Sequence, residues 1–448
     1  MSEYRGLVLR LLKRASARVG DRILVEVAGM RYEGLLMPRT ELGEPDHIVL
    51  KLPNGYNVGV KISGKARITL LERGSPPSLK PSPLPERSAA AKPVTIIGTG
   101  GTIASKVDYR TGAVYPAFTP HEIYGAVPEL AEIADIRVEE VCNVFSEHMT
   151  PELWVRIGRA VARAIRRGAS GAVVSHGTDT MGYTAAALSF MLGGLYRPVV
   201  MVGSQRSSDR PSTDAALNLI SAVSVAANSD IAEVTVVMHG SMDDDHCLIH
   251  RGTKVRKCHT SRRDAFMSVN ELPLGIVRGK EIEMLRSDYR RARERGRIVL
   301  RGKFEKRVAL LKVTPGLGSD LMKRLISGGY RGFVIEGTGL GHAPEGLFGG
   351  IRKAVDSGIP VVMTSQCLWG RVDMKVYSTG RDLLKMGVIP GEDMLPETAW
   401  VKLMWVLGQT RNMEKVRELM RANLAGEITE RTMPESYGAR VMSGLQKP

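Results

Sequence analysis

The sequence contains few cysteines and no long apolar run. Four cysteines occur among its 448 residues, at positions 142, 247, 258 and 367, and none of them forms a CxxC pair. This spacing provides no disulfide framework and is typical of a protein in a reducing compartment. No apolar stretch reaches the length of a membrane span, and residues 1–19 mix Arg and Lys into their apolar residues without a signal-peptide core. We therefore expect a cytoplasmic protein with no membrane segment.

Acidic residues are outnumbered by basic ones. The chain has 63 Lys and Arg against 47 Asp and Glu, which gives a formal net charge of +16. A basic surplus favours acidic partners such as RNA, although a basic enzyme with no nucleic-acid role explains the charge at least as well. Residues 286–307 are the most densely basic segment. They form either an RNA-facing patch or a solvated charged face, and we favour the second interpretation.

A segment rich in Pro and Ser, GSPPSLKPSPLPERSAAAK at residues 74–92, separates two regions with different patterns. This composition is typical of a linker stiffened by polyproline II conformation. Before it, short runs rich in Val, Ile and Leu alternate with Gly, Pro and Asn, at 22–27, 31–37, 47–52, 57–62 and 66–71. Their length and spacing predict β-strands. We therefore expect residues 1–73 to form a small all-β, barrel-like domain without a catalytic role.

After the linker, predicted strands and helices alternate. The first region contains expected strands at 93–97, 172–175, 198–202 and 234–238, and helices at 151–167, 180–192 and 213–227. The pattern restarts with strands at 308–313, 332–335 and 360–364, and helices at 319–327, 344–356, 396–407 and 414–422. This order predicts an α/β fold with largely parallel sheets that are covered on both faces. We expect a larger α/β domain with the active site at 93–285, a basic connection at 286–307 and a smaller α/β domain at 308–448.

Polar motifs follow two of the predicted strands, where catalytic side chains of open α/β sheets collect. The first is GTGGTIAS at 98–105, whose glycines allow a tight turn that exposes a threonine hydroxyl to substrate. A phosphate-binding loop is a weaker alternative, because the G-x-G-x-x-G spacing and the P-loop lysine are missing. The second is SHGTDTM at 175–181. Its hydroxyl and carboxylate are suited to proton transfer, or they simply cap a helix.

Two further segments contain polar groups suited to substrate binding or catalysis. Residues 251–266 include lysines, and a partly desolvated lysine can act as a base, although in so basic a stretch it is more often a surface charge. Ser146 and Glu147 follow another expected strand, where they either bind polar groups of the substrate or belong to an ordinary loop. The acidic run at 243–245, with its neighbouring His and Cys residues, matches no zinc spacing, and we expect no metal site.

In this order, TGGTIAS at 99–105 and HGTDTM at 176–181 are similar to the paired signature of bacterial-type L-asparaginases. The resemblance extends from residue 93 to the C-terminus and implies a two-domain α/β core that hydrolyses asparagine or glutamine side-chain amides. It assigns catalytic roles to Thr102, Thr178, Asp179 and Lys257. The lysine is Lys257 rather than Lys254, because the family's lysine lies nine residues before the aromatic residue of the DAF element, here Phe266.

The same resemblance implies a mechanism and a substrate pocket. Thr102 attacks the amide carbon and ammonia leaves, while the other three catalytic residues relay protons and main-chain N–H groups of the Gly-rich turn stabilise the oxyanion. The family leaves open which threonine attacks first. Ser146 matches a substrate-binding serine, and Tyr109 matches a tyrosine of the mobile loop. Glu147 stands where many asparaginases have glutamine, so asparagine and glutamine both remain candidate substrates.

The β module, the linker and the NVFSEHM segment at 143–149 make the whole chain similar to the D-subunit family of archaeal glutamyl-tRNA(Gln) amidotransferases. This resemblance implies that the chain produces ammonia from glutamine. A partner, the E subunit of the amidotransferase, would bind Glu-tRNA(Gln), activate its glutamate with ATP and Mg, and accept the ammonia. It also implies a homodimeric core, and the sequence itself contains no ATP-binding motif. The alternatives are a stand-alone cytoplasmic L-asparaginase and an RNA-binding protein on an inactive asparaginase fold.

Overall fold

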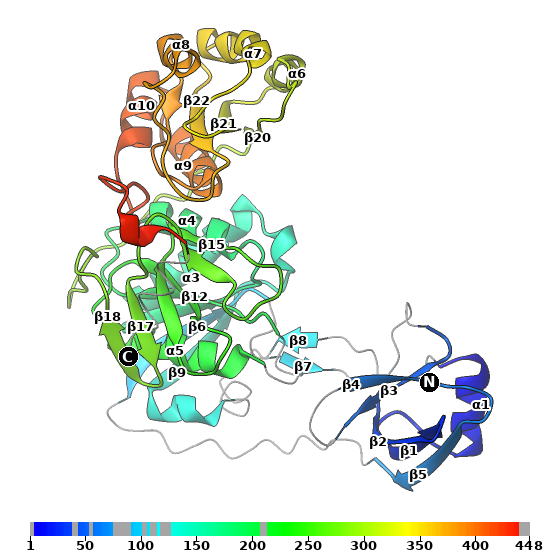
Figure 1. Cartoon of the computed structure of the whole chain (residues 1–448). Helices are drawn as coiled ribbons and strands as arrows, with labels where there is room; N and C mark the ends of the chain where they lie inside the picture. Colours follow the sequence, from blue (N-terminus) through cyan, green and yellow to red (C-terminus); the bar gives the residue numbers. More distant parts are fainter. Residues whose placement is uncertain are drawn as a thin grey trace. The chain divides into compact units, whose positions relative to one another are not determined.

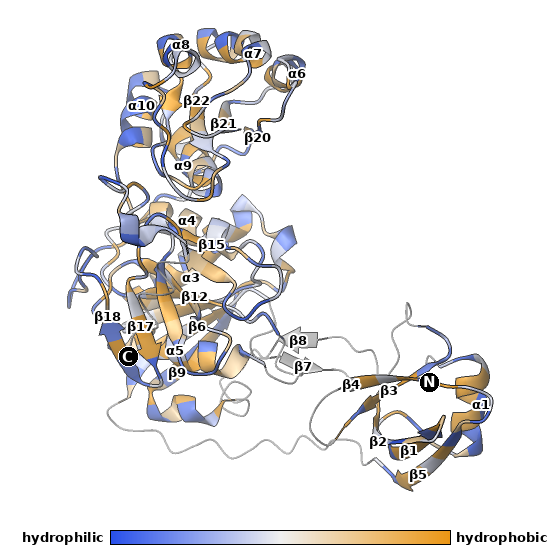
Figure 2. Ribbon diagram, viewed as in Figure 1, coloured by the Kyte–Doolittle hydropathy of each residue, from blue (hydrophilic) through white to orange (hydrophobic). Residues whose placement is uncertain are grey.

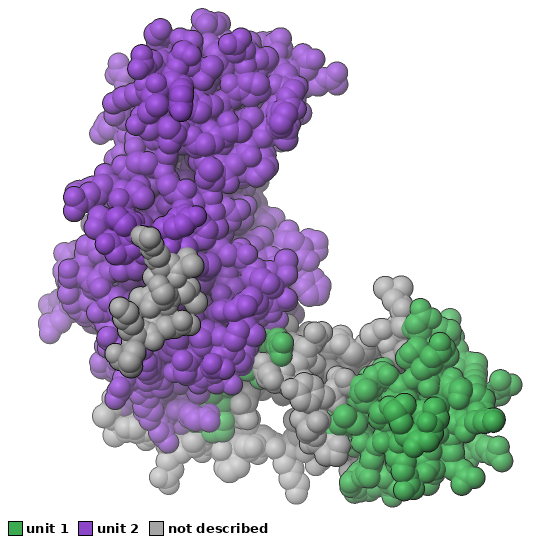
Figure 3. Space-filling model, viewed as in Figure 1, with its two compact units in different colours: residues 1–85, 102–128, 206–216 green, residues 86–101, 129–205, 217–448 purple. Residues whose placement is uncertain are grey.

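The structure is a computed structural model, and it describes residues 4–37, 44–52, 57–74, 91–100, 105–107, 114–116, 127–206 and 213–438. The chain forms two compact units (Figure 3). The first contains residues 1–85, 102–128 and 206–216, and the second contains residues 86–101, 129–205 and 217–448. No helix of the described ranges combines the length and the apolarity that crossing a bilayer requires.

The first unit contains an antiparallel sheet in the order β4-β3-β2-β1-β5. Its strands are β1 (Arg22–Val27), β2 (Met30–Leu36), β3 (His47–Lys51), β4 (Asn57–Lys61) and β5 (Arg67–Glu72). These strands confirm the predicted strand positions to within one or two residues. A two-stranded sheet of β7 (Ser105–Val107) and β8 (Val114–Pro116) also belongs to this unit.

A helix that was not predicted covers the core of the β domain. It is α1 (Gly6–Arg14), and its buried Val8 and Leu12 join a core with alternate strand residues such as Val25 and Leu50. The four-residue spacing of Val8 and Leu12 is helical, but the lysine and arginines between the apolar residues obscure it in so short a segment. The domain is therefore a β-sheet capped by one helix.

The larger sheet of the second unit has the order β18-β17-β14-β13-β12-β10-β6-β9. Five neighbouring strands are parallel: β6 (Lys92–Gly98), β9 (Ala134–Glu140), β10 (Gly171–Ser175), β12 (Val199–Val202) and β13 (Val234–His239). Three antiparallel strands extend one edge: β14 (Cys247–Arg251), β17 (Gly275–Arg278) and β18 (Glu281–Met284). The expected parallel sheet is present, and the antiparallel edge was not predicted, because its short strands are separated by hairpins and polar loops.

Helices cover both faces of this sheet (Figure 1). On one face, α3 (Pro151–Arg166) and α4 (Met181–Met191) share a core with Ala172 and Val174 of β10. The opposite face receives α5 (Ala215–Asn228), since a Cβ added to Gly171 of β10 would lie 2.2 Å from a main-chain oxygen of that helix. The predicted N-cap of α3 is confirmed by a hydrogen bond from the Leu153 N–H to the Thr150 hydroxyl (3.4 Å).

The C-terminal half of the second unit is a smaller α/β domain with a parallel sheet in the order β20-β21-β22-β23. Its strands are β20 (Val308–Lys312), β21 (Gly332–Gly337), β22 (Val361–Ser365) and β23 (Ile389–Pro390). Its helices are α6 (Asp320–Ser327), α7 (Glu345–Asp356), α8 (Ser378–Met386), α9 (Pro396–Gln409) and α10 (Met413–Arg421). Figure 2 shows apolar residues concentrated in the central strands of both α/β domains. The predicted fold class, two α/β domains preceded by a small β domain, is confirmed.

The two α/β domains share one hydrophobic core. Buried residues of α4 pack against buried residues of α9, and the aromatic rings of Trp154 and Trp400 meet edge-on with centroids 6.2 Å apart. The basic connection at 286–307 is mostly exposed, although its Tyr289 and Ile298 are buried. It contains β19 (Val299–Leu300), which pairs with β11 (Leu192–Gly193). The 3-10 turns are η1 (Pro128–Glu132), η2 (Ser146–His148) and η3 (Pro434–Ser436). The two α/β domains of the second unit are therefore held together by side-chain packing as well as by the connecting segment.

Candidate functional site

Thr178 and Asp179 lie in the turn between β10 and α4, at the carboxyl edge of the larger sheet. The Lys257 side chain reaches both of them. Its Nζ donates to the Thr178 hydroxyl oxygen over 2.8 Å and to Asp179 Oδ1 over 2.7 Å. The lysine side chain is 14% exposed and the aspartate side chain is 67% exposed, so the group opens to solvent on the aspartate side. A hydroxyl, an ammonium and a carboxylate are thus connected at one point, although they lie up to 79 positions apart in sequence.

A short hairpin holds Lys257 in place. The lysine ends β15 (Val255–Lys257), which pairs with β16 (Phe266–Ser268), and Lys257 lies opposite Phe266 in the register. Phe266 is buried in the large core and fixes the hairpin against the sheet. The nine-residue spacing between the lysine and the aromatic residue therefore corresponds to a cross-strand pair.

The second lysine of the segment has a different environment. Lys254 is fully buried, and its Nζ donates to Asp393 Oδ2 over 2.6 Å and to the Asp393 main-chain oxygen over 3.2 Å. Asp393 follows β23 in the smaller domain, so this pair joins the two α/β domains. Lys254 is engaged there, and Lys257 is the lysine that reaches Thr178.

Ser146 lies beside the Thr178 turn, whereas its neighbour Glu147 is exposed. Ser146 is 4% exposed, and its main-chain oxygen accepts a hydrogen bond from the Thr180 hydroxyl over 2.6 Å. A Cβ added to Gly177 would lie 2.8 Å from the Ser146 Cβ and 3.0 Å from its Oγ. The absence of a side chain at Gly177 is therefore what allows the serine to approach the second motif.

The start of the first motif lies at the same edge of the sheet. The Thr99 hydroxyl donates to the Ser175 main-chain oxygen over 2.7 Å, which ties the first motif to the second. Gly100 has a φ of +104°, and a Cβ there would lie 2.4 Å from the Val144 main-chain oxygen. The sequence shows the two motifs but does not show that Thr99 links them. Two predicted site residues, Thr102 and Tyr109, lie outside the described residues.

The acidic run at 243–245 forms ordinary polar contacts. Asp244 Oδ1 lies 3.1 Å from His239 Nε2 and accepts a 2.6 Å hydrogen bond from Arg263. Asp245 accepts from the Ser241 hydroxyl over 2.6 Å and pairs with His246. Within the described ranges, no three His, Cys, Asp or Glu side chains are arranged to hold a metal ion.

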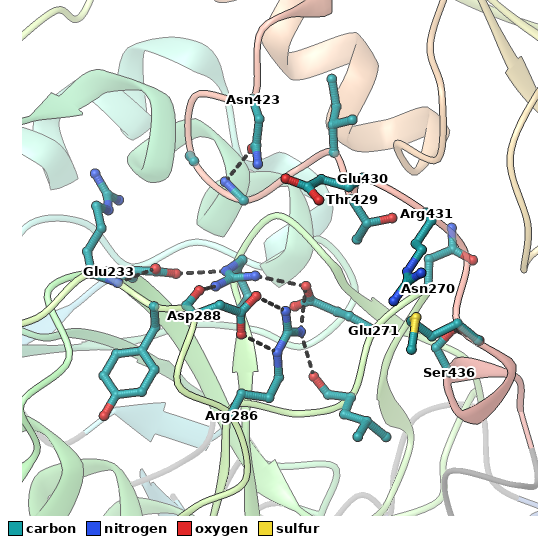
Figure 4. A pocket seen from close by; sticks show the side chains of 18 of the residues that line it. Glu233, Asn270, Glu271, Arg286, Asp288, Asn423, Thr429, Glu430, Arg431 and Ser436 are labelled. Carbon is teal, nitrogen blue, oxygen red and sulfur yellow. Dashed lines mark hydrogen bonds and ion pairs between the residues drawn. The ribbon is translucent and has the colours of Figure 1, made fainter.

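A separate pocket of about 960 Å³ lies between the larger domain and the segment at 423–436, and none of the predicted site residues lines it (Figure 4). Its wall is a network of ion pairs. Buried Arg251 binds Glu233 and Glu271 (2.8 Å each), and Arg286 binds Glu271 (2.7 Å) and Asp288 (2.5 Å). Two guanidinium groups thus pair with three carboxylates, and Arg251 also donates to the Asp288 main-chain oxygen over 2.7 Å. The network supports the packing of the C-terminal segment on the larger domain.

Comparison with protein families divides the chain into three matched regions. Residues 17–71 match the GatD N-terminal domain, residues 93–290 match the asparaginase N-terminal domain, and residues 307–420 match the glutaminase/asparaginase C-terminal domain. The thermostable L-asparaginase from Thermococcus kodakarensis superposes with a TM-score of 0.68 and 34% identity, over 75% of this chain and 99% of that chain. The probable cytoplasmic L-asparaginase from Campylobacter jejuni gives a TM-score of 0.62 at 28% identity, over 73% and 99%.

Relatives that match nearly the whole chain are D subunits of an amidotransferase. The D subunit of the glutamyl-tRNA(Gln) amidotransferase of Pyrococcus abyssi is 56% identical over 95% of this chain and 98% of its own length. The same subunit of Methanothermobacter thermautotrophicus is 56% identical over 96% and 98%. These matches extend over 95% and 96% of the chain, whereas the two asparaginases cover 75% and 73% of it. The chain therefore belongs to the D-subunit family of glutamyl-tRNA(Gln) amidotransferases.

Proposed function

We propose that this chain releases ammonia from the side-chain amide of glutamine with Thr102 as nucleophile and with Thr178, Asp179 and Lys257 as its proton-transfer group. The observation that supports the proposal best is the pair of hydrogen bonds from Lys257 Nζ, to Thr178 at 2.8 Å and to Asp179 at 2.7 Å. Thr102 follows Gly100 by two residues in the sequence, and Gly100 lies against the loop that leads to Ser146.

The chemistry of the group follows from its connectivity. A threonine hydroxyl attacks a carbonyl carbon only when a base removes its proton. The connected group of Thr178, Lys257 and Asp179 takes up that proton and passes it to the departing ammonia, while Asp179 holds the Lys257 side chain in position. The acyl-enzyme is then cleaved by water, which the same group activates. Main-chain N–H groups of the two motif turns stabilise the negative oxygen in both steps.

Substrate contacts are assigned to Ser146, Glu147 and Tyr109. Ser146 lies against Gly177 next to the catalytic turn, and the exposed Glu147 carboxylate is suited to the α-ammonium group of an amino acid. Asparagine and glutamine share this ammonium group, so Glu147 does not distinguish them, and glutamine as the amide donor rests on the similarity to D subunits. The described residues provide no metal cluster, and we assign ATP and Mg to the partner subunit.

We further propose that the chain acts in the cytoplasm as a homodimer together with the amidotransferase E subunit, which binds Glu-tRNA(Gln) and accepts the ammonia. Support comes from the full-length similarity to D subunits, including the N-terminal domain. The domain limits at residues 73, 93, 285 and 308 remain part of this proposal. A stand-alone L-asparaginase is the competing function, because the superposed solved structures are asparaginases.

The test measures ammonia release from glutamine and from asparagine, with and without the partner subunit and Glu-tRNA(Gln). Lys257→Met and Thr178→Val should each lower kcat about 100- to 10,000-fold, the range for loss of general acid–base catalysis. Arg256→Met is the matched control. Arg256 is the cation next to Lys257 on the same strand, but it pairs with Glu397 (3.4 Å). Full activity in Lys257→Met would exclude the proposed catalytic group. Rapid asparagine hydrolysis that gains nothing from the partner and tRNA would favour the stand-alone asparaginase.

A further inference from the structure

Three buried polar side chains form a hydrogen-bonded chain behind the catalytic turn. Trp154 of α3 donates from its indole Nε1 to the Thr184 hydroxyl oxygen over 3.0 Å. Thr184 Oγ1 of α4 lies 2.9 Å from His176 Nε2, and His176 Nδ1 lies 2.7 Å from the Gly177 main-chain oxygen. The three residues are 4%, 0% and 1% exposed, so water does not compete for these bonds.

The position of each proton in this chain is determined by chemistry. The indole N–H can only donate, and the Gly177 carbonyl can only accept. His176 Nδ1 therefore carries a proton and donates it to the carbonyl. Burial lowers the pKa of His176 to about 4, so the ring is neutral near pH 7 and its Nε2 accepts the proton of the Thr184 hydroxyl. The chain runs in one direction, from Trp154 through Thr184 and His176 to the Gly177 oxygen.

This series of hydrogen bonds fixes the orientation of the Gly177–Thr178 peptide. In a trans peptide the carbonyl and the N–H point in opposite directions. Because the Gly177 carbonyl points to the buried imidazole, the Thr178 N–H points away from it. No hydrogen bond of this N–H is formed within the described part of the chain. The same residue uses its hydroxyl to bind Lys257, so its N–H is available beside the reactive group.

The backbone around this peptide has almost no space to adjust by other means. The His176 N–H donates to the Val202 main-chain oxygen over 2.9 Å, which ties the start of the turn to β12. A Cβ added to Gly203 would lie 2.6 Å from the His176 main-chain oxygen and 3.1 Å from the Thr178 methyl group. The turn is therefore held by a main-chain hydrogen bond to β12 and by the hydrogen bond of the His176 imidazole to the Gly177 oxygen.

We propose that Trp154, Thr184 and His176 are positioning residues that orient the Gly177–Thr178 peptide, so that the Thr178 N–H donates to the amide oxygen as it becomes negative. This inference rests on the proposed amide hydrolysis. A preorganised N–H contributes mainly in the transition state, since the carbonyl oxygen gains charge only there. The three side chains do not contact the substrate and act through the peptide.

The decisive variant is Thr184→Val, which keeps the size of the side chain and removes the hydroxyl between Trp154 and His176. We expect kcat for ammonia release to fall about 10- to 100-fold with KM changed less than about threefold, because one oxyanion donor is worth about 100- to 1,000-fold when lost outright. Thr184→Ser is the matched control. It restores the hydroxyl, and it should restore kcat to within about threefold of the original chain.

A second pair of variants keeps the inference testable if Thr184→Val folds poorly. In His176→Asn the amide nitrogen replaces Nδ1 as donor to Gly177, whereas in His176→Leu no donor remains. His176→Asn should therefore keep at least about tenfold more of kcat than His176→Leu. The folded fraction of each variant is measured by near-UV circular dichroism, so that kcat refers to folded protein.

The outcomes separate the two proposals. If Lys257→Met abolishes ammonia release while Thr184→Val and His176→Leu retain kcat, the positioning inference is wrong and the catalytic assignment stands. If the variants change only KM and stability, the three hydrogen-bonded side chains have only a structural role, and the inference is also wrong. If Lys257→Met retains full activity, the proposed function itself fails. A selective loss of kcat that serine and asparagine rescue supports the inference.

Discussion

At the scale of single residues, close approaches that exclude a side chain shape the site. Gly177 contacts Ser146 and Gly100 contacts Val144, and in both places a Cβ would lie within 3 Å of another atom. At Gly100 the φ of +104° also disfavours any other residue. In the sequence these glycines are recognisable only as turn residues. The space that they leave open is visible only when the two loops are seen together.

Gly177→Ala should displace Ser146 and impair substrate binding. Misplacement by about 1 Å can cost about 100-fold in rate, so we expect kcat/KM for glutamine to fall roughly 10- to 100-fold. Steady-state kinetics of ammonia release measures the effect. Gly349→Ala is the control. Gly349 is exposed in α7, and the nearest atom to an added Cβ would be 3.7 Å away. Unchanged kinetics in Gly177→Ala would show that the serine does not depend on this contact.

The two lysines of the 251–266 segment should respond in opposite ways. Lys254→Met leaves buried Asp393 with Arg371, 3.8 Å away, as its remaining cation, and we expect a loss of about 3 kcal/mol in the free energy of unfolding. Lys257→Met should change stability by less than about 1 kcal/mol, since its partner Asp179 is exposed. Denaturant unfolding and ammonia release, measured on both variants, separate stability from catalysis. Equal stability losses would contradict the different roles of the two lysines.

At the scale of elements, two buried histidines of the larger sheet make the stability of the domain depend on pH. His250 lies in β14 with its Nδ1 2.9 Å from the Ser268 hydroxyl of β16, and burial lowers its pKa to about 3. His176 follows β10, and burial lowers its pKa to about 4. Both rings are neutral in the folded protein at pH values where the unfolded chain, with a histidine pKa near 6.5, binds protons.

The free energy of unfolding should therefore decrease as the pH falls from about 6.5 to about 4. In this interval the unfolded chain binds more protons than the folded chain, and each histidine contributes up to about 1.4 kcal/mol per pH unit. Above pH 6.5 this contribution is fully present. His250→Leu should reduce the slope by up to about 1.4 kcal/mol per pH unit, the contribution of one histidine. Chemical denaturation at several pH values measures it, and an identical slope in the variant would contradict the pKa of about 3 for His250.

At the scale of the whole molecule, residues around Asp393 join the two α/β domains of the second unit. Besides Lys254, Asp393 binds the Thr429 N–H (2.9 Å), and its main-chain oxygen accepts from the Asn270 amide (3.0 Å). Asn270 also exchanges two hydrogen bonds with Gly370, of 3.0 and 2.8 Å, and has a φ of +64°. Asparagine tolerates this conformation better than most residues.

Asn270→Ala should weaken the connection between the two domains. It removes three hydrogen bonds at about 1 kcal/mol each and places a residue with a Cβ but no polar group at positive φ, so we expect about 3 kcal/mol or more of destabilisation. Calorimetry should show a lower Tm. Asn270→Gly is the informative comparison, because it loses the same bonds but accepts the positive φ, and it should lose less stability. Equal Tm values for both variants would show that the positive φ at position 270 does not contribute to the loss of stability.

The sequence alone determined the order of elements and the position of the motifs. Alternating apolar strands and amphipathic helices are local patterns, and they predicted β10, α3 and α4 to within two residues. The antiparallel edge at 247–284 and helix α1 were not predicted, because short segments carry too few apolar positions to define a period. The motif residues Thr178, Asp179 and Lys257 were named from sequence, and their catalytic roles remain predictions.

Tertiary structure alone decided which groups meet. Lys254 pairs with a residue 139 positions away and Thr99 with one 76 positions away, and no local pattern specifies such partners. The buried chain from Trp154 to Gly177 depends on three elements packed in one core, so its polar members look like ordinary helix and turn residues in the sequence. The physical reason is that hydrophobic periodicity acts within a segment, whereas hydrogen bonds and ion pairs between segments exist only after packing brings them together.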